Sequence, residues 1–341
     1  MTISDIERLI EPAEAADEAV LEITLRPQNL VEFVGQEQIK QNLTVAIQAA
    51  KKRNESLEHI LLYGNPGLGK TTLASIIARE MRASIKITSG PALEKVGDLA
   101  AILSNLQPGE ILFIDEIHRL NKTIEEVLYP ALEDYSLDII LGKGPAARTI
   151  RMPLNRFTLI GATTKLSMIS NPLRDRFGHT YHLNFYEIAD IERIINRNAN
   201  LLSVRLDEAS RPLIAARSRR TPRIANRLLK RIRDVAEIDN NGLIDTHVTG
   251  KAFGMLGIDE FGLDEIDRRL LSFLIEKFNG GPVGLNTLSA AIAEEMDTIE
   301  TVYEPFLLQI GFLERTPRGR RATAAAYSHL GFDAPKAQTL L

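Results

Sequence analysis

A glycine-rich stretch of this chain has the residue types and the spacing of a phosphate-binding loop. Residues 64–71 read Gly-Asn-Pro-Gly-Leu-Gly-Lys-Thr and fit the pattern G-x-x-x-x-G-K-[ST]. Glycines let the backbone bend around an anion, so that successive N–H groups point at its oxygens. In this pattern Lys70 reaches the β- and γ-phosphates of a nucleotide, and the hydroxyl of Thr71 binds Mg²⁺.

The segments that flank the loop predict the strand and the helix that must position it. The apolar run 59–63 has the length of a buried strand, and apolar residues recur at helical spacing from Leu73 to Met81. The loop therefore opens a helix, whose N-terminus favours negative charge. This context disfavours the alternative, a glycine-rich turn with a surface lysine. Further upstream, Leu25 and Arg26 are expected to line the adenine site or, alternatively, to pack as a plain linker.

A second apolar run, at 111–114, ends in Asp115 and Glu116. Such runs are typical of parallel strands that are covered on both faces. Ligands bind at the carboxyl ends of these strands, and acids there are costly unless they face a cation or water. We expect Asp115 to hold Mg²⁺, mostly through water, and Glu116 to be the base for the attacking water. The alternatives are a helix N-cap and a first-turn helical acid. His118 is expected to pack or to hydrogen-bond.

A third apolar run, at 157–161, leads to Thr163 and Thr164. A hydroxyl at this strand end would meet the γ-phosphate or the attacking water. The sequence does not separate the two threonines, and we favour Thr164. A further strand is expected at 179–185, and the alternation of strands with helical segments predicts an α/β fold.

The composition is that of a globular protein and excludes several kinds of chemistry. The chain has 341 residues, enough for two or three domains, with a net charge of −4 and no cysteine. Disulfides, cysteine-based zinc sites and a cysteine nucleophile are therefore excluded. Residues 1–20 are acidic where a signal peptide would be basic, and no apolar run approaches the ~20 residues of a membrane helix. We expect a cytoplasmic protein that does not contact a membrane.

Residues 137–152 depart from the α/β rhythm with two β-like runs around a Gly/Pro turn, which predicts a hairpin. Its apolar residues Ile139, Ile140, Leu141 and Ile150 favour a docking site for a partner protein. The alternative, packing of the hairpin on its own domain, stays open at this point.

Residues 187–257 are helical and rich in basic side chains, between segments in which acidic ones prevail. Thr221 and Pro222 predict a helix N-cap followed by proline at the first helical position. Arg223 then lies in the first turn, where the helix dipole disfavours a cation. An anion opposite it, such as a γ-phosphate, would remove this conflict; the alternative is a solvated arginine. The buried face of the helix is expected to contain Ile224, Leu228, Leu229, Ile232 and Val235.

Residues 258–341 predict three helices followed by a β-hairpin, the order of a winged-helix domain. The stretch 290–304 is acidic and has no basic residue, so it is a poor candidate for the major groove of DNA. The predicted wing carries Arg315, Arg318, Arg320 and Arg321. We therefore predict contact between the wing and DNA phosphates without base reading. The alternative is a winged helix used for protein contact.

Several short runs occur together in one order along the chain. They are the phosphate loop, DEIHRLN at 115–121, GATT at 161–164, NPLRDRFG at 171–178, TPRIANRLL at 221–229 and FLERTPRGR at 312–320. From about Leu25 to Phe332 the chain resembles the RuvB family of bacterial Holliday-junction branch-migration ATPases, in the AAA+ superfamily. The loop and the acidic box alone are superfamily signals, whereas DEIHRLN, the hairpin, DRFG and RTPRGR together are specific to the family. Asn65 departs from it, at a free loop position where the family usually has proline.

The resemblance implies an α/β P-loop AAA+ domain with a helical lid and a C-terminal winged-helix domain. Residues 1–186 would form the ATPase domain with an N-terminal tail, 187–257 the lid and 258–341 the DNA-binding head domain. The hairpin at about 137–152 would dock the junction-binding protein RuvA. Family members hydrolyse ATP with Mg²⁺ at the subunit interfaces of a hexameric ring on duplex DNA. They drive branch migration of Holliday junctions in recombination and repair, with RuvA and the resolvase RuvC as partners.

The resemblance also implies roles for individual residues. Arg176 would be an arginine finger that acts on the ATP of a neighbouring subunit, and Arg223 would sense the γ-phosphate. The implied catalytic residues are Glu116, Arg176 and Thr164, the metal-binding ones Thr71 and Asp115, and the DNA-binding ones Arg315, Arg320 and Arg318. The implied ATP-binding residues are Leu25, Arg26, Gly67, Lys70, Thr71, Thr72, Glu133, Asp134, Tyr135, Arg176, Tyr186 and Arg223.

Two other classes of function compete with a DNA motor. An ATP-driven protein remodeller predicts an aromatic pore loop in the ATPase domain and no basic wing, whereas this sequence has the reverse. A clamp-loader-like ATP switch need not hydrolyse its nucleotide quickly. The presence of Glu116 and Arg176 argues against such a switch.

Overall fold

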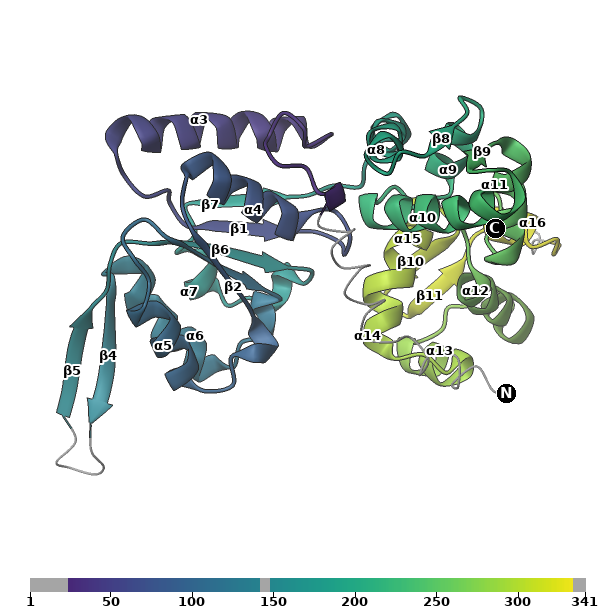
Figure 1. The fold of residues 1–341 in the computed structure, drawn as a ribbon. Coiled ribbons are helices and arrows are strands. Elements are labelled where there is room, and N and C mark those ends of the chain that lie inside the picture. The colour runs from purple at the N-terminus through teal and green to yellow at the C-terminus, as the bar shows by residue number, and fades with distance from the viewer. Residues whose placement is uncertain (1–23, 142–147, 334–341) are drawn as a thin grey trace. The chain divides into compact units, whose positions relative to one another are not determined.

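The computed structural model describes residues 24–141 and 148–333, which form two compact units (Figure 1). The first contains the described chain up to Gly64, then Gly69–Asn184 and Asn200–Ser203. The second contains Asn65–Leu68, Phe185–Ala199 and the chain from Val204 onward. Residues Asn65–Leu68, the crest of the phosphate loop, therefore belong to the second unit, while both ends of the loop belong to the first.

The first unit is built on a parallel sheet in the order β2-β3-β6-β1-β7. Its strands are β1 (Ile60–Tyr63), β2 (Ile85–Ser89), β3 (Ile111–Asp115), β6 (Thr158–Thr163) and β7 (His179–His182). The helices are α3 (Glu37–Arg53), α4 (Lys70–Met81), α5 (Val96–Ser104), α6 (Lys122–Glu133) and α7 (Asn171–Arg174). They cover both faces of the sheet, with α3 and α4 on one side and α5, α6 and α7 on the other (Figure 1). This cover explains why the three apolar runs predicted as buried strands form β1, β3 and β6.

The register of the sheet brings three predicted site positions to one edge. Tyr63, the last residue of β1, pairs with Thr163, the last residue of β6. Asp115 ends β3, which lies on the other side of β6. Because the strands are parallel, Gly64, Asp115 and Thr163 all lie at their carboxyl ends, where ligands bind in sheets of this kind.

The segment predicted as a hairpin is one. Strands β4 (Ser136–Leu141) and β5 (Arg148–Pro153) pair antiparallel and extend away from the sheet of the first unit (Figure 1). At its base Leu137 is buried in the core of the unit, while Ile150 is half exposed. The side chains of Ile139, Ile140 and Leu141 lie outside the described residues.

The second unit begins with a helical region. Its elements are α8 (Ile188–Leu201), β8 (Arg205–Leu206), α9 (Ser210–Ala216), α10 (Pro222–Asp239), β9 (Leu243–Ile244) and α11 (Thr246–Met255). The predicted buried face of α10 is partly wrong, because Ala225 and Ala236 are buried while Ile224 and Val235 stay partly exposed. The packing neighbours α9 and α11 set the inward face, and a pattern of large apolar residues does not reveal it.

The rest of the second unit is a winged helix, as predicted. Its elements are α12 (Glu265–Phe278), α13 (Leu285–Ile292), α14 (Met296–Thr298), the π-helical η6 (Ile299–Tyr303), α15 (Glu304–Gln309), β10 (Leu313–Thr316), β11 (Gly319–Ala322) and α16 (Ala324–His329). The antiparallel strands β10 and β11 form the wing, and Val283 pairs with Arg320 on its edge. Within the described part of the chain, no helix is long and apolar enough to cross a bilayer.

Candidate nucleotide site and DNA-contacting wing

The phosphate loop joins β1 to α4, as its pattern predicts. Gly67 has a φ of 80°, in the left-handed region that glycine adopts without a Cβ clash. Lys70, the first residue of α4, is buried, and its Nζ donates a hydrogen bond to the carbonyl of Gly64, 2.8 Å away. The ammonium group therefore lies at the loop, close to the backbone that would surround a phosphate.

The two predicted Mg²⁺ ligands lie next to each other. The hydroxyl of Thr71 donates to Oδ2 of Asp115 over 3.2 Å. Both groups offer hard oxygen donors, which Mg²⁺ prefers. Among the described residues there is no cluster of three His, Cys, Asp or Glu side chains that would hold a metal by itself. The arrangement thus fits an ion that keeps several waters and binds the phosphates of its substrate.

The helix that follows these ligands does not use Asp115 as its N-cap. Its cap is Asn121, whose side chain accepts a hydrogen bond from the N–H of Ile124. Glu116 precedes the 3₁₀ turn η3 (Ile117–Arg119) in a left-handed conformation, with a φ of 47°. Its side chain is 46% exposed and pairs with Arg119 at 3.1 Å. The carboxylate is therefore accessible to water, as a general base requires.

The two candidate threonines differ in their hydrogen bonds. Oγ1 of Thr163 is 2.9 Å from Nδ1 of His118 and accepts from the N–H of Lys165. Thr163 is buried, whereas Thr164 is partly exposed. His118 has the hydrogen-bonding role predicted for it. Thr163 thus serves the scaffold of the strand end, which leaves Thr164 the better candidate for a contact with phosphate or water.

Arg176 follows α7 and is held by the first unit. Its guanidinium lies 4.4 Å from the ring centroid of Tyr129 and 3.1 Å from a carboxylate oxygen of Glu133. It also donates to the carbonyl of Pro172. Glu133, predicted to lie near the nucleotide, therefore pairs with the predicted finger.

The neighbours of Glu133 have other contacts. Asp134 pairs with Arg151 of the hairpin, and Tyr135 packs against His59 and Phe157. Near the start of the described chain, Leu25 is buried and Arg26 is partly exposed.

The loop crest meets α10 within the second unit. The N–H of Arg223 donates to the carbonyl of Gly67 over 3.4 Å. A Cβ on Gly67 would come within 3.1 Å of the Cβ of Arg223, so the close approach and the φ of 80° together favour glycine there. The hydroxyl of Tyr186 donates to the carbonyl of Leu68. The side chain of Arg223 is exposed, which fits both the predicted contact with a γ-phosphate and the alternative of a solvated arginine.

The predicted start of α10 is confirmed in position, although its cap lacks the usual side-chain bond. Thr221 is at the N-cap position and Pro222 is the first helical residue, but the threonine side chain makes no capping bond. Its hydroxyl donates backwards to the carbonyl of Ser218 instead, over 3.4 Å. The hydroxyl is thus used by the preceding turn, in which Arg219 and Arg220 both adopt left-handed conformations.

The arginines of the wing are not all free cations. Arg315 pairs with Glu300 at 2.8 Å and with Glu304 at 3.1 Å. Arg320, whose side chain is 12% exposed, binds the 2% exposed Glu304. Within the described chain, the Arg318 side chain forms no ion pair with an acid. Sequence reasoning missed these pairs, although the acidic stretch 290–304 and the basic hairpin have complementary charge.

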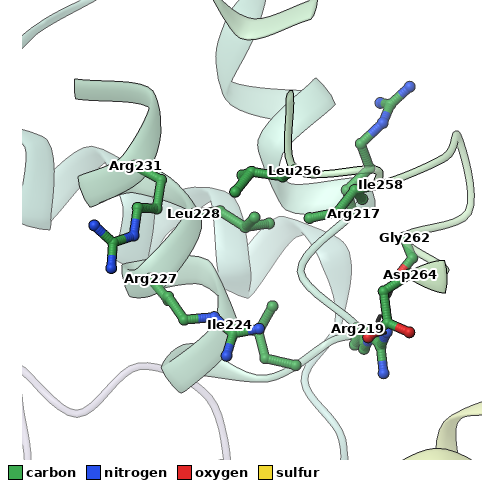
Figure 2. Close-up of a pocket in the computed structure, with 10 residues that line it drawn as sticks. All are labelled: Arg217, Arg219, Ile224, Arg227, Leu228, Arg231, Leu256, Ile258, Gly262 and Asp264. Atoms are coloured by element: carbon green, nitrogen blue, oxygen red, sulfur yellow. Dashed lines mark hydrogen bonds and ion pairs between the residues drawn. The ribbon is translucent and has the colours of Figure 1, made fainter. Parts of the chain in front are cut away.

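A pocket of about 290 Å³ in the second unit was also not predicted. It is lined by Arg217, Arg219, Ile224, Arg227, Leu228, Arg231, Leu256, Ile258, Gly262 and Asp264 (Figure 2). At one edge Arg219 lies beside Gly262 and Asp264, and it is the most buried of the lining arginines. The run RSRR at 217–220 shows a basic segment, but nothing in it indicates which arginine is buried.

A parallel sheet with a phosphate loop, a helical lid and a winged helix define an ATPase of the AAA+ class. Three family models match: the Holliday junction DNA helicase RuvB P-loop domain at residues 25–183, the RuvB AAA lid domain at 186–259 and the RuvB C-terminal winged helix domain at 260–331. The chain therefore belongs to the RuvB family.

Individual relatives agree with these models over nearly the whole chain. The Holliday junction branch migration complex subunit RuvB of Dehalococcoides mccartyi is 60% identical over 324 residues, which are 95% of this chain and 93% of that protein. The subunit of the same name from Chloroflexus aggregans is 58% identical over 330 residues, 97% of this chain and 94% of that protein. The solved structure of the Thermotoga maritima RuvB Holliday junction branch migration motor has a TM-score of 0.84 at 50% identity, covering 92% of this chain and 100% of that one.

Proposed function

We propose that this protein is an ATP-driven DNA motor that promotes branch migration of Holliday junctions. One observation carries the proposal: a family match along nearly the whole chain, with Lys70, Thr71, Asp115 and Glu116 placed together at one sheet edge. The exposed carboxylate of Glu116 disfavours a switch that binds ATP without hydrolysing it. The winged helix with its basic wing disfavours a protein remodeller.

In the proposed reaction, the loop and Lys70 bind the phosphates of ATP. Thr71 and Asp115 hold Mg²⁺, which neutralises phosphate charge when it is bound. Glu116 takes a proton from the attacking water, and Thr164 and Arg223 contact the γ-phosphate. Leu25, Arg26, Gly67, Thr72, Glu133, Asp134, Tyr135 and Tyr186 complete the proposed ATP-binding set.

Three of the proposed site residues correspond to positions that are replaced in solved relatives. Structures of the Thermotoga maritima protein include variants in which a lysine, a threonine and an arginine are replaced. The same three residue types recur with identical spacing in this chain at Lys70, Thr164 and Arg176. This match favours Thr164 over Thr163, in agreement with their hydrogen bonds.

The proposal extends to assembly and partners. Arg176 reaches the ATP of a neighbouring subunit in a hexameric ring around duplex DNA. The hairpin at 137–152 docks RuvA at the junction, RuvC is a further partner, and the protein acts in the cytoplasm. Residues 1–186, 187–257 and 258–341 act as the ATPase domain, the lid and the DNA-binding head, whose Arg315, Arg318 and Arg320 contact phosphates.

The experiment that tests the function is migration of a synthetic four-way junction, with and without RuvA. We expect ATP-dependent conversion of the junction into two duplexes, faster with RuvA and absent for Lys70→Ala. A purified protein that hydrolyses ATP equally fast as a dilute monomer, and that leaves the junction intact with RuvA present, would overturn the proposal.

A further inference from the structure

A buried arginine connects the region matched by the lid model to the region matched by the winged-helix model. Arg219 belongs to the first of these regions and is only 7% exposed. Its Nε donates to the carbonyl of Gly262 over 3.0 Å, and its Nη2 donates to Oδ2 of Asp264 over 2.8 Å and to Oδ2 of Asp267. The guanidinium also lies 5.3 Å from the ring centroid of Phe306. All four partners belong to the winged helix.

These partners are not scattered over the winged helix but centre on the start of its first helix. Asp264 is the N-cap of α12, and its side chain accepts from the N–H groups of Ile266 and Asp267. The carboxylate of Asp267 accepts in turn from the N–H of Asp264. Arg219 therefore binds both members of a capping box, which fixes the end of α12 in position and direction.

On its other side, the turn that carries Arg219 is connected to the phosphate loop. Its neighbour Arg220 donates from Nε to the carbonyl of Tyr186 over 2.7 Å and accepts from the N–H of the same residue. The hydroxyl of Tyr186 binds the carbonyl of Leu68 in the loop crest. Four residues beyond Arg219, the N–H of Arg223 binds the carbonyl of Gly67. Two sets of hydrogen bonds, joined by the backbone of the turn at 218–223, thus connect the loop crest to α12.

We propose that Arg219 is a positioning residue that transmits the nucleotide state of the loop to the DNA-binding winged helix. The inference rests on the proposed function, because it needs ATP at the loop and DNA at the wing. When the nucleotide changes, Tyr186 and Arg223 shift with the loop crest, and the turn at 218–221 shifts with them. Arg219 then moves the N-terminus of α12, and with it the head domain.

A connection that only held the winged helix next to the lid region would not need a buried arginine of fixed geometry. Burying the guanidinium of Arg219 and the carboxylate of Asp267 is costly unless the geometry is close to ideal. Consecutive left-handed residues at Arg219 and Arg220, with φ of 48° and 53°, add backbone strain. An arginine binds several acceptors in a fixed orientation, which suits transmission of a movement better than a flexible connection.

The test compares Arg219→Ala, Arg219→Lys and the matched control Arg217→Ala in the full-length protein. Arg217 lines the same pocket, but its guanidinium donates to the carbonyl of Leu213 and lies over the ring of Phe253, both of which belong to the lid region. For Arg219→Ala we expect ATP hydrolysis without DNA and the affinity for duplex to stay near the wild-type values. The stimulation of ATP hydrolysis by DNA should fall at least about fivefold, the lower end of a typical coupling between sites. The ATP consumed per migrated junction should rise by a similar factor.

For Arg219→Lys we expect DNA stimulation of ATP hydrolysis between that of Arg219→Ala and that of the wild type, because lysine keeps the charge but not the fixed geometry. Arg217→Ala should behave as wild type. If Arg219→Ala does not fold, Arg219→Gln combined with Asp267→Asn removes both charges of the buried pair and carries the same expectation. A folded variant with wild-type DNA stimulation and wild-type ATP use per junction would overturn the inference. Failure of the proposed function is distinguishable, because the wild-type protein would then migrate no junction.

Discussion

At the scale of single residues, the proposed arginine finger is restrained before any neighbour is present. The guanidinium of Arg176 stacks on Tyr129, whose hydroxyl lies 3.2 Å from Ser170 and 3.2 Å from Glu125. Its ion pair with Glu133 is more exposed and therefore weaker. In the proposed mechanism the stacking preserves the direction of the side chain, and the pair with Glu133 is the contact exchanged for a nucleotide.

The position of Glu116 leads to a prediction about the chemical step. Glu116→Gln should bind ATP and assemble normally but lose hydrolysis by about 10²–10⁴-fold, the usual contribution of a general base. Single-turnover hydrolysis and equilibrium binding of ATP separate the two effects. The matched control is Arg119→Ala, which removes the exposed ion pair of Glu116 and should leave hydrolysis nearly unchanged. Normal turnover by Glu116→Gln would exclude Glu116 as the base.

At the scale of elements, ion pairs connect the strands of the wing to η6 and α15. Glu304 lies buried at the start of α15 and receives both Arg315 and Arg320, which face each other across β10 and β11. Arg320 therefore stabilises the domain whether or not DNA is bound. Two acids of the stretch 290–304, Glu300 and Glu304, thus hold Arg315 and Arg320 in position.

These pairs separate the effects of wing substitutions. Arg315→Ala with Arg320→Ala should weaken binding to unrelated duplexes alike and lower the salt slope by about one per lost phosphate contact. The change at Arg320 should also cost about 1–3 kcal/mol of unfolding free energy, because Glu304 loses a partner. Arg318→Ala is the control, expected to weaken binding without loss of stability. Binding as a function of salt on two sequences checks this, and a loss confined to one sequence would contradict backbone contact.

The capping box of α12 predicts a dependence of stability on pH. Burial raises the pKa of Asp267 to about 7, although the Arg219 guanidinium beside it acts in the opposite direction. An unfolded aspartate titrates near ~3.9, so in the window between these values the native state binds more protons. The unfolding free energy should therefore fall as pH rises from about 4 to about 7. Urea titrations should show a flatter profile for Asp267→Asn, and an unchanged slope would rule out this carboxyl as its source.

At the scale of the whole molecule, each subunit in the proposal contributes residues to two ATP sites. Its loop binds one ATP, while its Arg176 contacts the ATP of the next subunit. Hydrolysis then depends on assembly, because each active site needs residues from two chains. Such a finger contributes roughly 10³–10⁵ in rate in enzymes that use one.

Mixing two inactive variants tests this sharing. Lys70→Ala subunits and Arg176→Ala subunits should each be inactive, yet mixtures should recover part of the hydrolysis where an intact loop meets an intact finger. The matched control is Lys70→Ala mixed with Glu116→Gln, in which both changes lie on the loop side, so that no mixed interface is complete. Steady-state hydrolysis over a range of mixing ratios is the measurement. No recovery at any ratio would show that Arg176 does not act on a neighbour.

Features carried by local patterns could be predicted from the sequence, and those set by distant contacts could not. The phosphate loop, Asp115 at its strand end and the winged helix follow from short runs whose periodicity and polarity are local. The buried position of Arg219 could not be predicted, because its partners lie 43, 45 and 48 residues away and no local pattern distinguishes it within a basic run. The bond that Thr221 makes to Ser218 was hidden likewise, because the preceding turn decides it.

The ion pairs of the wing also bear on how such a protein releases DNA. A motor that steps along a duplex must release each phosphate as readily as it binds it. If the wing contacts DNA as proposed, Glu300 and Glu304 would compete with each phosphate for the guanidiniums of Arg315 and Arg320. The carboxylates would bind these arginines again as the DNA moves, so that each phosphate contact would be short-lived and rapid stepping would be favoured over tight binding.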